Sequence, residues 1–371
     1  MNLRELELRF FRNYEEQRFS FAPGVNLIVG SNAQGKTNLL EAISFLGSGK
    51  SFRAQKTGEM VGFSRDFGEI IGTCDSQGRE QTVRWVLYPN GRPRQLWRNG
   101  VRKKTAGDLT GVLPTVLFCP EDLMLVRAGA AARRRFLDTA LCQMRPNYAR
   151  YLEEYNRLHE HKTRILRDSE EKPSLLSMWE DFSLRMAHIG AQIIRYRAYY
   201  CRKLLKAAAA VYADIAPHEV LSGVYKTVSS VTDPFADART IEKQLIDHVF
   251  SHKTAEIAAK SCLSGPHKDD LELLLDGRSA ASFGSQGQVR TCTLSLKLAE
   301  RELFFDEDGE YPVLLLDDVL SELDRRRQDF VLNRISAGQV MITCCEDGIS
   351  EKLRAGAVFH IQNGEKSAET H

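Results

Sequence analysis

The sequence predicts an α/β fold in which α/β segments at the two ends of the chain bracket a mainly helical middle. Three observations lead to this prediction. A buried strand, a glycine-rich loop and a helix follow one another over residues 25–46. A second apolar run, 313–316, ends in two aspartates, and residues 131–213 carry helical periodicity with only two prolines and one glycine. The length of 371 residues allows one large domain or two medium ones.

The composition is that of an ordinary globular protein, with 43% hydrophobic and 27% charged residues. These fractions exclude a fully disordered chain, a collagen and a disulfide-rich miniprotein. No apolar run approaches the roughly 20 residues of a membrane-spanning helix, and the charged N-terminus has no apolar signal segment. The eight cysteines form no CxxC pair, so we expect reduced thiols. Together these features lead us to expect no membrane partner and a cytoplasmic location.

Strand patterns occur in both end segments. Apolar and polar residues alternate over 2–10, and turn residues at 75–78, 89–91 and 99–100 divide 68–102 into a predicted β-meander. Further strands are predicted at 112–118, 271–275, 313–316 and 340–344, with a helix over 291–305. The polar residues 362–371 are expected to form a frayed tail.

The helical middle contains a heptad-like seam. Its apolar positions are spaced alternately by four and three residues: Phe182, Met186, Ile189, Ile193, Tyr196 and Tyr200. An earlier stretch has a similar rhythm, with Tyr148, Tyr151, Tyr155 and Leu158, and a turn at 169–174 separates the two. This pattern predicts a short antiparallel, coiled-coil-like hairpin, although an ordinary helical subdomain would fit it as well.

The loop after the first buried strand matches the phosphate-binding pattern G-x-x-x-x-G-K-[ST]. Its predicted ATP-binding residues are Gly30, Ser31, Asn32, Ala33, Gln34, Gly35, Lys36 and Thr37. Glycines allow successive backbone N–H groups to face an anion, and the following helix adds the positive end of its dipole. We expect Lys36 to contact the β and γ phosphates and the Thr37 hydroxyl to bind Mg²⁺.

The strand at 313–316 delivers Asp317 and Asp318 to its carboxyl end, where ligands bind in open parallel sheets. We expect Asp317 to hold Mg²⁺ with Thr37, and Asp318 to act as the general base that orients the attacking water. Upstream, Ser285, Gln286, Gly287 and Gln288 precede a helix whose N-terminus is suited to an anion. The order of these three motifs is the one found in ABC-type ATPases.

Longer motifs make the sequence similar to the RecF family of bacterial DNA recombination and repair ATPases, over nearly the whole chain. The motifs are RFFRNYEE, GSNAQGKTNLLEAI, PEDLMLV, RRRFLD, SGPHKDDLEL, GSQGQVR and LLLDDVLSELDRRR. The resemblance implies an ABC-type P-loop ATPase head with an inserted, mainly helical lobe bearing the hairpin. Lobe I would comprise residues 1–125 and 283–371, and lobe II residues 126–282.

The resemblance also implies an ATP-dependent homodimer in which ATP lies between two heads. Ser285, Gln286, Gly287, Gln288 and, in the D-loop, Asp324 would then contact the ATP bound by the partner subunit. Arg53 and Arg12 would lie near nucleotide or DNA. Two departures from the ABC pattern are Asp318, where a glutamate is usual, and Thr343, where transporters have a switch histidine. We therefore expect slow ATP hydrolysis, and we identify no Q-loop glutamine.

The net charge of +2 conceals three charged stretches. Residues 79–104 carry eight basic and one acidic residue, 127–203 carry 16 and nine, and 300–329 carry four and 11. Basic stretches suit double-stranded and gapped DNA. The resemblance implies a clamp in recombinational repair and replication restart that works with RecR and RecO to load RecA. The alternatives are an ABC transporter subunit and a nuclease-linked ATPase; for the latter, the candidate acidic pair away from the ATP motifs is Asp269 and Asp270.

Overall fold

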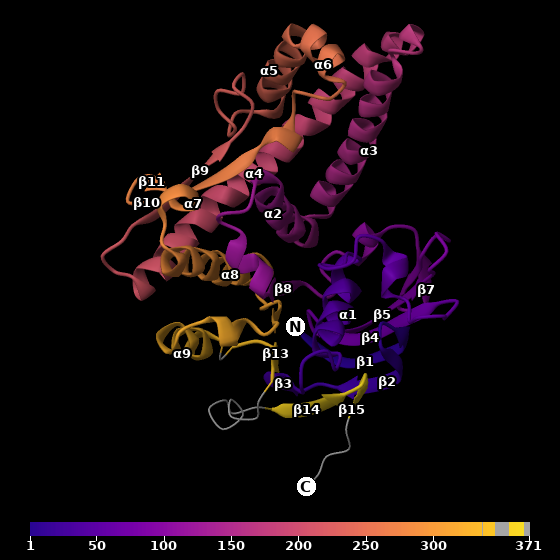
Figure 1. Cartoon of the computed structure of the whole chain (residues 1–371), viewed down its shortest axis with the longest axis vertical. Coiled ribbons are helices and arrows are strands. Elements are labelled where there is room, and N and C mark those ends of the chain that lie inside the picture. Colours follow the sequence, from indigo (N-terminus) through magenta and orange to yellow (C-terminus); the bar gives the residue numbers. More distant parts are fainter. Residues whose placement is uncertain (336, 346–355, 367–371) are drawn as a thin grey trace. The chain divides into compact units, whose positions relative to one another are not determined.

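The computed structural model describes residues 1–335, 337–345 and 356–366 (Figure 1). The chain divides into two compact units, which are treated separately below. Unit 1 comprises Met1–Met124 and Arg290–His371, and unit 2 comprises Leu125–Val289. Residues 283–289, which the resemblance assigns to lobe I, cluster with unit 2. Within the described residues, no helix combines the length and apolar character needed to cross a membrane.

The first sheet of unit 1 is antiparallel and contains the predicted meander. Its strands, in spatial order, are β2 (Tyr14–Ser20), β1 (Asn2–Phe11), β4 (Gly68–Ser76), β5 (Arg79–Leu87), β6 (Gln95–Arg98) and β7 (Val101–Lys103). A register shift between Leu3 and Glu5 resets the alternation of β1, so that Leu3 and Leu6 are both fully buried. Asn99 and Gly100 have positive φ, as the predicted turn between β6 and β7 requires.

The second sheet of unit 1 is mainly parallel and carries the motif strands. Its spatial order is β15 (Glu365–Lys366), β14 (Ala357–Gln362), β3 (Val25–Val29), β13 (Val340–Cys344), β12 (Val313–Leu316) and β8 (Thr115–Phe118). The inner strands are continuous apolar runs because both faces of such a sheet are covered. The strand predicted at 112–118 begins only at Thr115, where its pairing with β12 begins.

The expectation of a frayed tail over 362–371 is wrong for its first residues. β14 and β15 pair as a hairpin through a turn at Asn363 and Gly364, whose φ values of 52° and 78° are left-handed. An Asn-Gly pair favours this type of turn, so the hairpin was readable from the sequence. Residues 367–371 lie outside the described residues.

Helix α1 (Lys36–Ser48) forms the centre of the unit 1 core. Leu39, Leu40, Ile43 and Leu46 are fully buried and share one cluster with side chains from both sheets. The remaining helices of this unit are α9 (Arg325–Arg334) and the short turns η1 (Thr57–Met60), η2 (Ala106–Leu109), η3 (Pro120–Met124) and η6 (Val319–Glu322). Helix α8 (Gln286–Asp308) begins in unit 2 and ends in unit 1.

Unit 2 is built on three helices: α2 (Ala130–Met144), α3 (Pro146–Asp168) and α4 (Trp179–Ile215). Helices α3 and α4 form the predicted antiparallel hairpin, joined by η4 (Pro173–Met178). Tyr148 near the start of α3 meets Tyr196 on α4 at 5.6 Å between ring centroids. His161, later on α3, meets Phe182, near the start of α4, at 6.1 Å. The seam predicted on α4 is therefore the face that packs on α3.

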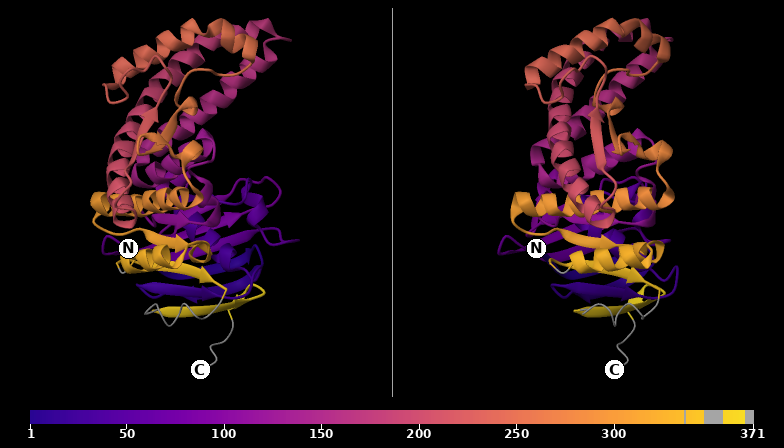
Figure 2. Two further views of the ribbon diagram at one scale, coloured as in Figure 1. Left: turned by 60° about the vertical axis from the view of Figure 1, so that its left-hand side comes forward. Right: turned by 90° about the vertical axis from the view of Figure 1, so that its left-hand side faces the viewer.

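The stretch between residues 215 and 262 was not assigned from the sequence. It forms β9 (Leu221–Lys226), α5 (Ala238–Ser251), which packs along α4 (Figure 2), and α6 (Lys253–Ala259). The remaining elements of unit 2 are η5 (Pro266–Lys268), β10 (Asp270–Leu275), β11 (Arg278–Ser279) and α7 (Ala280–Phe283). The three strands form a small antiparallel sheet in the order β11-β10-β9.

Candidate functional site

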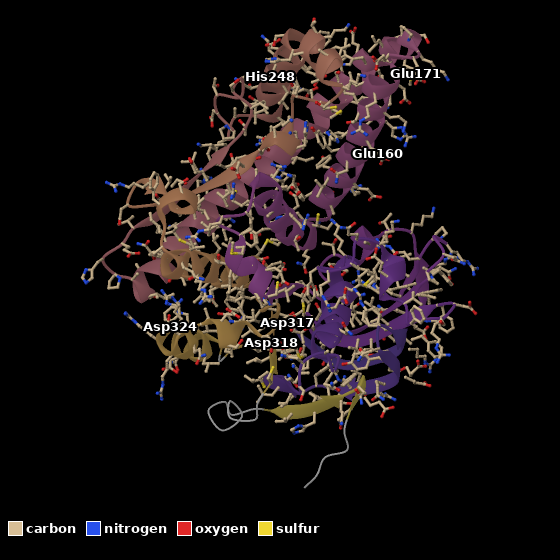
Figure 3. The ribbon with its side chains drawn as sticks, viewed as in Figure 1. Glu160, Glu171, His248, Asp317, Asp318 and Asp324 are labelled. Carbon is tan, nitrogen blue, oxygen red and sulfur yellow. The ribbon has the colours of Figure 1, made fainter. Side chains whose placement is uncertain are left out.

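The motif residues of unit 1 meet at one edge of the parallel sheet. Strand β13 lies between β3 and β12, with Cys344 opposite Val29 and Ile342 opposite Leu316. Because the three strands are parallel, the loops after their carboxyl ends emerge side by side. Figure 3 shows Asp317 and Asp318 at the end of β12, with Asp324 nearer to α9.

The loop over residues 30–35 has a backbone that ordinary residues rarely adopt. Gly35 has φ = 119°, and a Cβ there would lie 2.8 Å from Nδ2 of Asn13. A glycine is therefore required at this position. Ala33 is also left-handed, at φ = 65°. Such turns direct successive N–H groups inward, which is the geometry of an anion nest.

Two distant segments fix this loop, and sequence analysis identified neither of them. Asn13 Nδ2 donates to the carbonyl of Gln34 at 2.9 Å, and the Tyr14 hydroxyl donates to that of Gly35 at 3.0 Å. From the other side, the N–H of Asn363 donates to Gln34 Oε1 at 2.7 Å, and that of Gly364 to Gln34 O at 2.9 Å. The only sequence signal was the presence of Asn13 and Tyr14 in the RFFRNYEE motif.

Lys36 lies beneath the loop with its side chain 4% exposed. Its Nζ donates to the carbonyls of Gly30 at 2.6 Å and Ser31 at 3.1 Å, and lies 3.6 Å from Cys345 Sγ. The ammonium group is thus held against the first two residues of the loop. An anion in the nest would face this positive charge at short range, which strengthens their attraction.

Thr37 and Asp317 meet across the strand edge. The Thr37 hydroxyl donates to Asp317 Oδ1 at 3.0 Å, and the Thr343 hydroxyl donates to the same oxygen at 3.0 Å. Asp317 is buried, and burial raises the pKa of its carboxyl, whereas these two hydrogen bonds and the nearby Arg53 lower it. Hard cations prefer oxygen ligands of these types, so the pair fits Mg²⁺.

Asp318 has a strained backbone, with φ = 50°. A left-handed conformation costs a residue with a side chain roughly 1–2 kcal/mol, so surrounding contacts must hold it. Its N–H donates to Thr343 Oγ1 at 2.8 Å, and its carbonyl accepts from the Ser321 hydroxyl at 2.6 Å. Within the part of the chain that the structure describes, no hydrogen bond involves the carboxylate of Asp318. That group is therefore the one with freedom to act on a water molecule.

The segment Ser285–Gln288 in unit 2 is a capping box at the start of α8. The N–H of Ser285 donates to Gln288 Oε1 at 2.8 Å, and the N–H of Gln288 donates to Ser285 Oγ at 3.2 Å. Gln288 Nε2 also donates to Glu219 Oε1 at 3.0 Å. Ser285 Oγ is the acceptor in this motif, so the cap does not use its hydroxyl proton as a donor.

Asp324 begins α9 as its N-cap, and its side chain accepts from the N–H of Arg327 at 3.1 Å. The turn just before Asp324 is also anchored, because Arg290 Nη1 donates to the carbonyl of Glu322 at 2.6 Å. The carboxylate of Asp324 is half exposed. The turn before α9 thus keeps this carboxylate at the surface.

The structure places Arg53 and Arg12 differently. Arg53 is exposed, and its Nη1 donates to Asn38 Oδ1 at 2.9 Å, beside the first turn of α1. Arg12 makes a bidentate pair with the buried Glu41, with Nε and Nη2 at 2.8 and 2.7 Å from the two carboxylate oxygens. Its third nitrogen donates to the carbonyl of Glu59 at 2.8 Å. All three guanidinium nitrogens of Arg12 therefore have internal partners.

Fold and site together define the class: a P-loop nucleotide-binding protein with a helical insertion between its phosphate loop and its aspartate-bearing strand. A family model described as RecF/RecN/SMC N terminal domain matches residues 2–367. A DNA replication and repair protein RecF from Lactobacillus johnsonii is 38% identical over 369 residues, covering 98% of each chain. The chain belongs to the RecF family.

Further comparisons agree with this assignment. A protein of the same name from Acetivibrio thermocellus is 34% identical over 363 residues, again covering 98% of each chain. A solved structure described as RecF-ATP in the RecFOR pathway has a TM-score of 0.91 and 34% identity, covering 99% of this chain and 97% of that one. An Smc head domain from Pyrococcus furiosus shares the fold, with a TM-score of 0.56. The predicted ABC-type head with a helical insertion is thereby confirmed.

Proposed function

We propose that this protein is an ATP-dependent DNA clamp that acts in DNA replication and recombinational repair. One observation carries the proposal: Thr37 and Asp317 meet at 3.0 Å beside the buried ammonium group of Lys36. This is the arrangement that binds a nucleotide triphosphate with its metal. A solved relative with 34% identity is described as RecF-ATP, which supports ATP as the nucleotide.

Each residue of the site has a distinct task in binding ATP. The N–H groups of the loop and the ammonium group of Lys36 bind the β and γ phosphates. Thr37 and Asp317 hold Mg²⁺ through oxygen atoms. When bound, Mg²⁺ would neutralise the charge that develops on the β and γ phosphates. Loss of the Lys36 ammonium group or the Asp317 carboxylate should therefore weaken nucleotide binding directly.

Hydrolysis depends on the carboxylate of Asp318, which orients the attacking water and accepts its proton. An aspartate is one methylene shorter than the glutamate usual in ABC-type ATPases, so the water must come closer to the backbone. We therefore propose slow hydrolysis, suited to a switch between two states. No nuclease step is included, because Asp269 and Asp270 are occupied by Arg197 at 3.2 Å and Arg133 at 2.7 Å.

The clamp closes when two chains share two ATP molecules. The capping box leaves the proton of Ser285 able to donate to the γ phosphate bound by the other chain, together with the N-terminus of α8. Gln286, Gly287 and Gln288 complete this anion-binding turn, and Asp324 of the D-loop faces the same ATP. Hydrolysis removes the phosphate that both chains contact, and the dimer opens.

We place the main DNA contact on α4. Residues 182–213 contain six basic residues and no acidic one. Arg195, Arg202 and Lys206 recur at helical spacing along one face, which we call the α4 stripe. Arg202 also lies over the ring of the exposed Tyr199 at 4.9 Å. Such a stripe suits the phosphates of double-stranded or gapped DNA and gives binding that depends on salt but not on sequence.

The relatives also suggest protein partners. A structure described as belonging to the RecFOR pathway supports binding to RecR and RecO, and hence a part in loading RecA. Because chromosomal DNA is the proposed ligand, we place the protein in the cytoplasm. The basic stretch at 79–104 is a second surface for DNA or for a protein partner.

Sedimentation velocity tests the clamp. The wild-type protein should be monomeric alone and dimeric with ATP, whereas Lys36→Arg and Asp317→Asn should remain monomeric. Ser285→Arg should bind ATP and fail to dimerise, because the new side chain fills the phosphate-facing turn. A dimer in Ser285→Arg, or no dimer in the wild type with ATP, would contradict the shared-ATP arrangement.

DNA binding at several salt concentrations tests the α4 stripe. Replacing Arg195, Arg202 and Lys206 with glutamine should lower the slope of log K against log salt by about 2–3, since each lost phosphate contact removes roughly 0.9. The matched control replaces Arg157, Arg164 and Arg167 on α3, which are exposed and lie among acidic residues. If both triple variants lose equal affinity, the contact is not localised on α4.

A further inference from the structure

We propose that Thr343 is a positioning residue for ATP hydrolysis, whose single hydroxyl orients both Asp317 and Asp318. Thr343 ends the apolar part of β13, between the strand that leads into the phosphate loop and the strand that bears the two aspartates. It is 2% exposed. This inference rests on the proposed ATPase function and assigns a role to a residue outside the three motifs.

The hydroxyl of Thr343 uses its proton and a lone pair at the same time. It donates to Asp317 Oδ1 at 3.0 Å and accepts from the N–H of Asp318 at 2.8 Å. One side-chain oxygen therefore holds the carboxylate of one aspartate and the peptide group of the next. Valine has the same shape but can form neither bond.

The contact to Asp318 sets the direction of its carboxylate. The backbone of Asp318 is left-handed, at φ = 50°, a conformation that residues other than glycine disfavour. The hydroxyl of Thr343 holds the N–H side of this residue, and Ser321 holds its carbonyl at 2.6 Å. Without the Thr343 contact, the peptide before Asp318 loses its partner and the residue can relax away from the strained conformation. The carboxylate would then swing with the backbone.

The contact to Asp317 leaves one of its oxygens for a cation. Thr343 and Thr37 both donate to Oδ1, at 3.0 Å each. Among the described residues, no hydrogen bond involves Oδ2 of Asp317. The two hydroxyls thus hold Oδ1 in place, and Oδ2 stays available for a cation. Thr343 does this from the β13 side and Thr37 from the helix side.

The test compares Thr343→Val with Thr343→Ser. Outer contacts to metal-binding and reacting groups are typically worth 10–100-fold. We expect the valine variant to lose about 10–100-fold in kcat with KM for ATP changed less than about threefold, and the serine variant to stay within about threefold of wild type. The matched control is Thr293→Val, which deletes another fully buried hydroxyl of unit 1, one with no hydrogen-bond partner among the residues that the structure describes. It should leave both constants unchanged.

A second readout does not depend on turnover. The affinity of Mn²⁺ for the protein with bound ADP, followed by electron paramagnetic resonance, should fall about tenfold in Thr343→Val and remain unchanged in Thr293→Val. Asp318→Asn should abolish hydrolysis while keeping Mn²⁺ binding. If Asp318→Asn hydrolyses ATP at the wild-type rate, the proposed mechanism is wrong, whatever Thr343 does.

If Asp318→Asn is inactive but Thr343→Val matches wild type in kcat and Mn²⁺ affinity, the role of Thr343 is refuted. If the valine variant does not fold, Thr343→Ala is compared with Thr343→Ser instead. Both lack the methyl group of threonine, and only the serine variant keeps the hydroxyl. A higher kcat and Mn²⁺ affinity in the serine variant would support the proposal, and equal values would overturn it.

Discussion

Replacing Arg12 with methionine should destabilise unit 1, because Arg12 neutralises the buried carboxylate of Glu41. Glu41 lies on α1, one turn after the phosphate loop, and its side chain is fully buried. Two of the nitrogens of Arg12 donate to it, at 2.7 and 2.8 Å. Methionine keeps most of the apolar stem of the side chain and removes the charge. Ser51 then remains as the hydroxyl donor to Glu41.

The expected cost follows from the burial of the two partners. Removing one partner of a buried ion pair costs about 3–5 kcal/mol, because the other charge is left unpaired. Arg12 retains 21% exposure, so we take the lower end, about 3 kcal/mol. Unit 1 has 206 residues. For a domain of this size each kcal/mol shifts Tm by about 2–4 °C, which gives a fall of roughly 6–12 °C.

Calorimetry of four proteins measures this coupling: wild type, Arg12→Met, Glu41→Gln and the double variant. The double variant should be more stable than Arg12→Met, because glutamine carries no charge to leave unpaired. Arg65→Met is the control, since Arg65 and Glu15 form an exposed pair and their loss should change stability by less than about 1 kcal/mol. Additive losses in the double variant would refute the argument. If the double variant folds normally yet binds ATP or DNA weakly, the predicted contact of Arg12 with these ligands is supported.

Three further outcomes are expected. N-ethylmaleimide should react with Cys345, the one exposed cysteine of the described residues, and block ATP binding, because Cys345 Sγ lies 3.6 Å from Lys36 Nζ. Bound ATP should protect the thiol, and Cys345→Ser should bind ATP and resist the reagent. Burial lowers the pKa of His267 to about 3. The stability contributed by the neutral, buried imidazole is therefore complete above pH 6.5 and is lost as pH falls towards 3. Tm should fall less steeply over this pH range in His267→Gln than in the wild type. Lys162→Met should cost about 3–5 kcal/mol by leaving the buried Glu256 unpaired, and Glu256→Gln in the same chain should recover part of this in urea unfolding.

The sequence predicted those features that depend on local pattern. The phosphate loop, the strand that ends at Asp317 and the α3–α4 seam each lie within one continuous stretch of chain, where spacing alone indicates the structure. The capping role of Ser285 was readable for the same reason. By contrast, the elements between residues 215 and 262 were not predicted, although Ile241, Leu245 and Val249 of α5 recur at helical spacing after the N-cap Asp237.

Contacts between distant segments were not predictable. Arg12 and Glu41 are 29 residues apart, and Thr343 lies 26 residues from Asp317. Nothing in the local pattern distinguishes a hydroxyl that joins two aspartates from one that simply ends a strand. The partners of Gln34 come from residues 13 and 363–364, which meet only when the sheet is complete.

The order of strands in the parallel sheet also sets the order in which the protein can fold during its synthesis. Strand β3, which leads into the phosphate loop, has β13 and β14 as its neighbours, and Val25 pairs with Val340. At a synthesis rate of about 5–20 residues per second, these partners are synthesised roughly 15–60 s after β3. All of Leu125–Val289 emerges during that interval. All of unit 2 is therefore synthesised before the nucleotide site can form, and a nascent chain that stops before β13 has no nucleotide site.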